Sequence, residues 1–154
     1  YCLDNEISWT NWNNTAMAKD ISEFTKGLIR FRKEHKVLHL AEETRQMDYK
    51  SFGLPDMSYH GTKAWYADFS NFNRHFSAMY CGKYATMCGG NDEPDIYVAY
   101  NMFWKPIKFG IPSARNKKEW KVAFTTELSK NAEDVGVDRM YSVPARSITV
   151  LIAK

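Results

Sequence analysis

Apolar side chains recur every three or four residues near the start of the chain, with polar residues between them. This spacing places them on one stripe of an α-helix. The stripe consists of Ile21, Phe24, Leu28 and Phe31. Asn13, Asn14 and Thr15 precede it and are residue types that cap helix N-termini. The pattern predicts a long helix over residues 16–35.

After Leu40 the apolar residues alternate with polar ones in several short segments. Turn-forming glycines and prolines separate these segments, as in antiparallel β-sandwiches. The predicted strands lie at 56–60, 75–84, 96–102, 107–111, 120–124 and 148–152. Helices do not alternate with strands here, so we expect no complete barrel in this region. The fold class is therefore mainly β: a loop and one long helix in residues 1–40, then an antiparallel β-sandwich in residues 41–154.

Charge and hydropathy exclude two classes of partner. The net charge is only +3 and the basic residues are dispersed, whereas nucleic-acid-binding proteins gather them on one face. No apolar run approaches the ~18 residues needed to span a bilayer. We therefore expect neither a nucleic-acid partner nor a membrane partner.

Three cysteines, Cys2, Cys81 and Cys88, are too few and too irregularly spaced for a disulfide framework or a zinc site. Free thiols in a reducing cytoplasm are the expectation. His60 and His75 lack further ligands at metal-binding spacing, so a hydrogen-bonded structural role is favoured over metal binding. We expect no metal and no cofactor.

Two sets of residues are candidates for contact with a sugar. Asp4, Asn5 and Glu6 lie in the opening loop, where hydrogen bonds that fix the loop are the favoured alternative. Trp9 and Trp12 could stack on sugar rings, but packing of the loop onto the helix is favoured for them. Trp65 and Tyr66, followed by Phe69, form an aromatic stretch that either stacks on sugar rings or packs as a plug between helix and sandwich. The plug is the favoured interpretation.

Six segments, in order, resemble the isoamylase-type debranching enzymes, the isoamylase and pullulanase group of the α-amylase superfamily. They are residues 1–9 with Trp12, residues 23–35, residues 55–61, residues 68–70 with Arg74, residues 97–101 with Trp104 and Pro106, and residues 143–151. One departure is Phe69, where the family often has Trp. The resemblance implies that the helix closes a (β/α)8 barrel and that the β-sandwich is the family's C-terminal domain.

The resemblance also implies what the chain does. The family hydrolyses α-1,6-glucosidic branch points of glycogen and starch by a retaining mechanism, with two carboxylates about 5 Å apart. In the family these groups lie on earlier barrel strands, so we expect no catalytic residue here and a chain cut from a longer one. The expected role is to brace the catalytic barrel, which would be its partner within the same polypeptide. The alternative is a free-standing glucan-binding module that uses the aromatic loop around Trp65.

The helix stripe needs a cover if the barrel is absent, because an exposed apolar stripe is adhesive. We expect the sandwich and its linker to cover part of it. The remainder would mediate self-association through Ile21, Phe24, Leu28 and Phe31.

Overall fold

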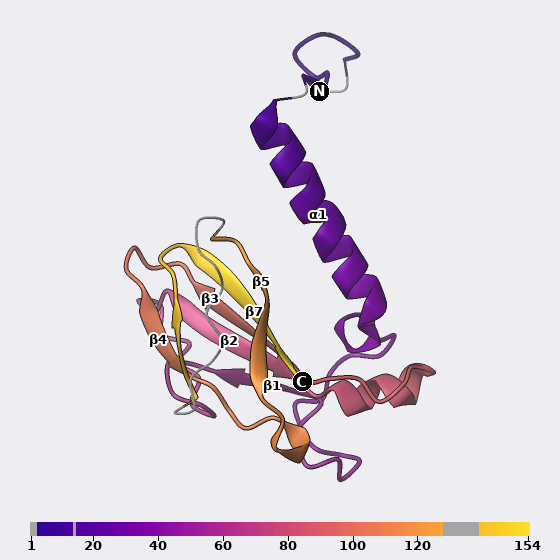
Figure 1. The fold of residues 1–154 in the computed structure, drawn as a ribbon, viewed down its shortest axis with the longest axis vertical. Helices are drawn as coiled ribbons and strands as arrows, with labels where there is room; N and C mark the ends of the chain where they lie inside the picture. Colours follow the sequence, from indigo (N-terminus) through magenta and orange to yellow (C-terminus); the bar gives the residue numbers. More distant parts are fainter. Residues whose placement is uncertain (1–2, 14, 128–138) are drawn as a thin grey trace. The chain divides into compact units, whose positions relative to one another are not determined.

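The computed structural model describes residues 3–13, 15–127 and 139–154, which divide into two compact units, residues 1–34 and 35–154. The first unit holds a loop and helix α1 (Ala16–Glu34), as predicted from the apolar stripe (Figure 1). Thr15 caps this helix, since its Oγ1 accepts a hydrogen bond from the Ala18 N–H at 3.1 Å. Arg32 and Lys33 lie in the last turn, where positive charge favours the helix dipole.

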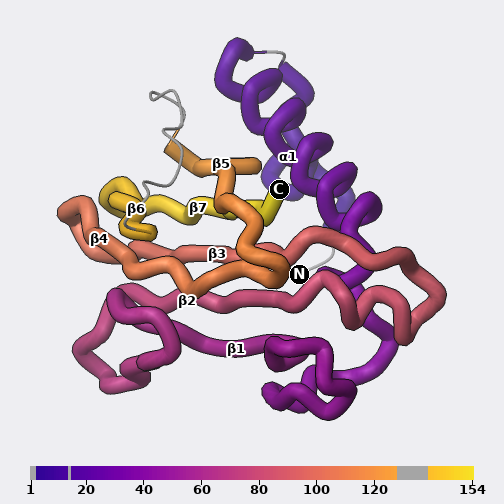
Figure 2. The backbone as a smooth tube through the Cα atoms, turned by 60° about the horizontal axis from the view of Figure 1, so that its bottom comes forward, coloured from indigo at the N-terminus to yellow at the C-terminus, as the bar shows by residue number. Residues whose placement is uncertain are grey.

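The second unit contains two antiparallel sheets. One has five strands in the order β1-β2-β3-β7-β5, and the other pairs β4 with β6 (Figure 2). The strands are β1 (Met57–His60), β2 (His75–Tyr80), β3 (Ile96–Asn101), β4 (Ile107–Gly110), β5 (Trp120–Thr125), β6 (Met140–Val143) and β7 (Ser147–Ala153). Short 3-10 helices are η1 (Lys36–His39), η2 (Gly82–Cys88) and η3 (Arg115–Lys117). The described residues therefore confirm a mainly β fold consistent with a sandwich.

Two predicted strand assignments differ from the structure. Strand β2 ends at Tyr80 instead of residue 84, because the chain turns into η2 at Gly82. A Cβ atom at Gly82 would lie 2.2 Å from the Glu93 carbonyl oxygen, so this turn requires glycine. Strand β6 was not predicted, since its sequence Met-Tyr-Ser-Val does not alternate between apolar and polar residues.

The second unit begins at His35 and so includes η1. A contact distant in sequence holds η1 to this unit. The Glu93 carboxylate accepts hydrogen bonds from the backbone N–H groups of Lys36 and Val37, at 2.8 and 3.3 Å. These bonds fix η1 to the sandwich, and Val37 is only 3% exposed.

The core lies between the two sheets. Met79, Tyr97 and Leu151 stand opposite one another on β2, β3 and β7 and are fully buried. Phe109 of β4 and Val143 of β6 cover them from the smaller sheet. The opposite face of the five-stranded sheet carries a second apolar set, in which Ala78, Val98 and Val150 stand side by side. Each central strand is thus apolar on both faces.

Candidate functional site

The opening loop is held by hydrogen bonds between its own residues. The Trp9 indole N–H donates to the Asp4 carboxylate, and the Asn5 side-chain oxygen accepts the Ile7 N–H at 3.1 Å. Asp4 and Asn5 therefore act as the loop fixers favoured from the sequence. Glu6 is exposed, and Trp9 and Trp12 are 62% and 88% exposed, so neither indole is buried by helix α1.

The aromatic stretch forms a tight turn at the end of β1. The Gly61 N–H donates to the Tyr66 carbonyl at 2.7 Å, and the Tyr66 N–H returns a bond to the Lys63 carbonyl at 3.3 Å. Trp65 stands at the tip with a positive φ of 65°, a conformation that L-residues rarely adopt. A structure that holds this backbone conformation must supply compensating contacts.

Buried His60 supplies those contacts. Its Nδ1 accepts the Trp65 backbone N–H at 2.7 Å, and the two rings meet edge to face with centroids 4.8 Å apart. Since Nδ1 is an acceptor, Nε2 carries the proton and donates to the Ser58 hydroxyl at 2.9 Å. Burial lowers the pKa of His60 to about 4, so the ring is neutral at physiological pH. His60 therefore has the structural role favoured from the sequence, with both ring nitrogens in use.

The same turn leaves aromatic surface open. Trp65 is 51% exposed, Tyr66 68% and Phe69 68%. Phe69 contacts Tyr59 of β1 edge to face at 5.5 Å. Within the second unit these rings are anchored on one side and open to solvent on the other, a geometry that suits stacking on a sugar ring. Asp4, Asn5, Glu6 and Trp9 belong to the first unit, whereas Trp65 and Tyr66 belong to the second.

The acidic residues after η2 serve the fold. Asp95 is 2% exposed, and its carboxylate accepts hydrogen bonds from the Gly82 N–H at 3.0 Å and from the Arg115 N–H and Nε–H at 2.8 and 2.7 Å. Asp92 bonds Lys83 and Arg115 at 2.9 and 3.0 Å. This cluster ties three loops together.

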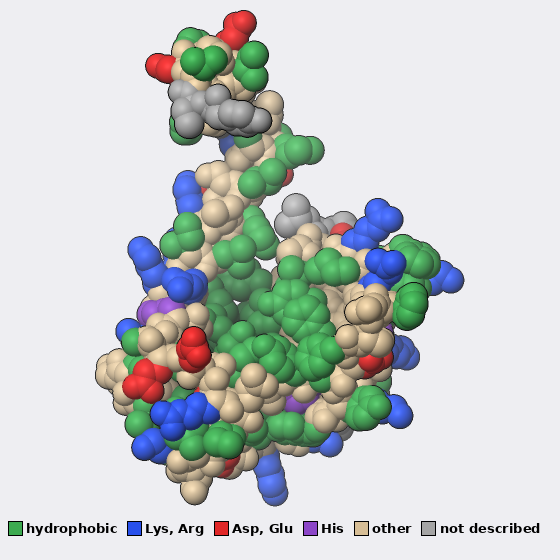
Figure 3. Space-filling view, turned by 180° about the vertical axis from the view of Figure 1, so that it is seen from behind, with side chains coloured by type: hydrophobic (Ala, Val, Ile, Leu, Met, Phe, Trp, Pro, Cys, Tyr) green, Lys and Arg blue, Asp and Glu red, His purple; other side chains and the backbone are tan. Residues whose placement is uncertain are grey.

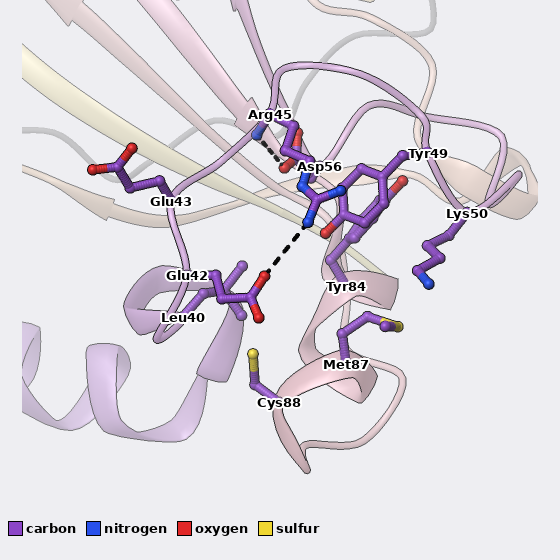
Figure 4. Close-up of a pocket in the computed structure, with 10 residues that line it drawn as sticks. All are labelled: Leu40, Glu42, Glu43, Arg45, Tyr49, Lys50, Asp56, Tyr84, Met87 and Cys88. Carbon is purple, nitrogen blue, oxygen red and sulfur yellow. Dashed lines mark hydrogen bonds and ion pairs between the residues drawn. The ribbon is translucent and has the colours of Figure 1, made fainter.

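A pocket of about 230 Å³ lies between the loop after η1 and the end of η2 (Figure 4). Arg45 spans it, 4.4 Å above the Tyr49 ring and 3.7 Å from the Glu42 carboxylate. The carboxylate of buried Asp56 accepts the backbone N–H groups of Arg45 and Met57. Glu42 and Glu43 project in different directions in Figure 4. The pocket therefore shows no pair of facing carboxylates of the kind that glycoside hydrolysis requires.

The remaining expectations concern metals, thiols and membranes. Over residues 3–13, 15–127 and 139–154, no group of three His, Cys, Asp or Glu side chains is arranged to hold a metal ion. Cys81 and Cys88 are free, and burial raises the pKa of Cys81 to about 11. Cys2 lies outside the described residues. Within the same ranges, every helix is too short or too polar to cross a bilayer.

Fold and site together define a class: an antiparallel β domain preceded by a single helix, with its polar clusters committed to structure and one open aromatic turn. No protein-family profile matches the chain. An isoamylase from a Flavobacterium species is 27% identical to it over 165 residues. The alignment covers the whole chain but only 21% of that relative.

The resemblance seen in the ordered motifs is thereby confirmed, because the whole chain is similar to part of an isoamylase. At this identity the comparison supports the family and no individual member.

Proposed function

We propose that the chain is the non-catalytic C-terminal domain of a debranching glycoside hydrolase related to the isoamylases. Its role is to brace the catalytic barrel of the same polypeptide, with helix α1 as the last barrel helix. The observation that carries this proposal is the similarity to an isoamylase along the entire chain. The activity of that polypeptide would be hydrolysis of α-1,6-glucosidic branch points, as the family resemblance implies.

The state of the carboxylates supports a non-catalytic role. A retaining pair needs two carboxyl groups about 5 Å apart with pKa values driven in opposite directions. Asp48, Asp56 and Asp95 instead accept backbone N–H groups. Burial opposes ionisation of Asp48, but bonds from Phe52, Gly53 and Tyr84 outweigh it and lower its pKa. The three carboxylates are occupied by hydrogen bonds from the backbone, which suits a scaffold and not a general acid.

The first unit supports the bracing role. Helix α1 has no buried residue, and large apolar side chains of this unit are exposed. They are Leu3, Ile7, Trp9, Trp12, Met17, Ile21, Leu28 and Ile29. Such surface is costly in water and marks a contact with further protein. The free thiols Cys81 and Cys88 suit a reducing cytoplasm, where glycogen-type substrates are stored.

The test compares two proteins on pullulan and on a branched glucan. The full polypeptide that contains this chain should release reducing sugar, and the 154-residue chain alone should release none. Sugar release by the isolated chain that is lost on a point substitution within it would contradict the proposal.

The open aromatic turn favours a second candidate, a glucan-binding module. Trp65 is held rigidly by His60, and a pre-organised aromatic ring loses little entropy on binding. Calorimetry with a branched maltooligosaccharide separates the two functions. Micromolar affinity that Trp65→Ala abolishes would support the module, provided that Trp104→Ala, at a similar exposure of 58%, leaves it intact. Millimolar or no binding would favour the bracing domain.

A further inference from the structure

The outward face of the five-stranded sheet is apolar except at its β5 edge, where Lys121 stands beside Ile152. We define the outer sheet face by nine of the residues that point away from the core: Tyr59, Phe76, Ala78, Tyr80, Val98, Tyr100, Phe124, Ile148 and Val150. Met57, Ile96 and Ile152 lie on the same side and are buried. Register places Phe76, Tyr100 and Ile148 in one row across β2, β3 and β7. Tyr59, Ala78 and Val98 begin a second row, which Val150 and Phe124 complete.

Figure 3 shows a broad patch of apolar side chains on one face of the molecule. Phe76 and Tyr100 stack with centroids 4.4 Å apart and rings only 6° from parallel. Phe69 extends the patch at its β1 edge through its contact with Tyr59. Phe76 remains 37% exposed and Phe69 68%. The rings are thus pre-arranged by the strands and still present surface to solvent.

The nine residues of the outer sheet face carry no charge, and their polar groups are three tyrosine hydroxyls. Lys121 shares their side of the sheet but lies on the edge strand β5. Soluble β-sheets usually alternate, with one face on the core and the other polar. Strands that are apolar on both faces are typical of sheets covered on both sides. Interfaces that never open are more apolar than transient ones, and charged residues are depleted at their centres.

The composition of this face also distinguishes between kinds of ligand. A sugar site needs several polar side chains that hydrogen-bond hydroxyl groups. Three tyrosines among nine residues supply little of that chemistry, whereas they suit a protein interface, where tyrosine is enriched. The chain matches only 21% of the length of its isoamylase relative. A polypeptide of that kind carries a large further body of protein, tethered to this face at high effective concentration.

We propose that the outer sheet face is the surface on which the preceding part of an isoamylase-like polypeptide docks, an inference that rests on the proposed bracing role. The sheet then has the core on one side and the preceding protein on the other. The bracing role acquires a defined surface, distinct from the Trp65 turn and from the polar clusters around Arg115.

Hydroxyl-radical footprinting of the 154-residue chain and of the full polypeptide tests this docking. In the full polypeptide, oxidation of Phe76 and Tyr100 should slow several-fold relative to the isolated chain. Met87 on η2, 48% exposed and outside the face, should react equally in both. Equal labelling of Phe76 and Tyr100 in the two proteins would overturn the proposal. So would protection that is already present in the isolated chain and rises with its concentration, because a second copy would then be the cover.

A matched pair of substitutions gives an independent readout. Met102 follows β3 in the alternation of the outer sheet face and is 50% exposed, close to Met87. Met102→Lys should lower the melting temperature of the full polypeptide more than that of the isolated chain, and Met87→Lys should affect both alike. Identical effects of the two substitutions in the full polypeptide would count against docking. Neither assay measures sugar release, so the docking proposal is tested separately from the proposed debranching activity.

Discussion

Single buried polar residues hold the loops of the second unit to its sheets. Asp95, Asp56 and His60 each accept backbone N–H groups from segments that are far away or turn sharply. A buried hydrogen-bond donor or acceptor that loses its partner lowers the stability of the fold by about 1–3 kcal/mol, and by more when the group is charged. These residues therefore carry stability out of proportion to their size.

Asp95→Ala should be strongly destabilising. It removes the carboxylate that binds Gly82 and Arg115, and leaves the guanidinium of Arg115, only 13% exposed, with less compensation. Breaking a buried ion pair typically costs about 3–5 kcal/mol. Asp92→Ala is the control, since its side chain is 47% exposed and such pairs contribute at most about 1 kcal/mol. Urea unfolding measures the loss of stability in both variants. Similar losses for the two would refute the role of Asp95 in holding the loops together.

His60 should make stability depend on pH. Its folded pKa is about 4, below the usual value of 6.5, so the unfolded chain binds the proton more readily. The stabilisation is complete above pH 6.5 and is lost as pH falls towards 4. Between pH 7 and 5 the free energy of unfolding should fall by about 2 kcal/mol on this account. His60→Asn should flatten that slope in urea titrations, with His75, whose pKa burial also lowers, unchanged in both proteins. An unaltered slope would exclude His60 as its source.

At the scale of elements, helix and strands use their apolar residues differently. Ile21 and Leu28 of α1 are 60% and 38% exposed, although they lie on the stripe that predicted the helix. In the strands, many of the residues that revealed the alternation, such as Val98 and Val150, lie on the outer sheet face and not in the core. Apolar periodicity therefore located the elements without telling which partner covers each face.

The helix stripe should drive self-association when the chain is studied alone. Replacing Ile21 and Leu28 together by Gln should shift the sedimentation of a concentrated sample towards the monomer, because each exposed apolar side chain contributes to contact between copies. Ser22→Gln, on another side of the same helix, should change nothing. A wild-type chain that is monomeric at high concentration would contradict this expectation.

At the scale of the whole second unit, one amide joins the two sheets. Asn101 is fully buried at the end of β3, and its Nδ2 lies 2.9, 3.1 and 2.8 Å from the carbonyl oxygens of Lys105, Val143 and Pro144. Its Oδ1 accepts the Phe103 N–H at 3.0 Å. The larger sheet is thus tied to the end of β6 and to the loop before β4.

Asn101→Ala should destabilise the unit by about 2–3 kcal/mol, because several buried carbonyls and one N–H lose their partner at once. Asn73→Ala serves as the comparison, since it removes a half-buried amide that bonds only the Asp68 carbonyl and the His75 N–H. Thermal unfolding measures both. A smaller loss for Asn101→Ala than for Asn73→Ala would rule out this amide as the link between the sheets.

The sequence by itself predicted a helix over 16–35, which the structure places at Ala16–Glu34, together with most strands and the resemblance to the isoamylases. It could do so because period and turn chemistry are local and ordered motifs survive low identity. The tertiary structure alone decided that Glu93 fixes η1 to the sandwich, that His60 positions Trp65, and that β6 completes a second sheet. Their partners lie distant in sequence, or in a segment whose residues do not alternate between apolar and polar. For a strand with apolar residues on both faces, the face that meets the core depends on how the two sheets stack. The order of residues along one strand does not contain that information.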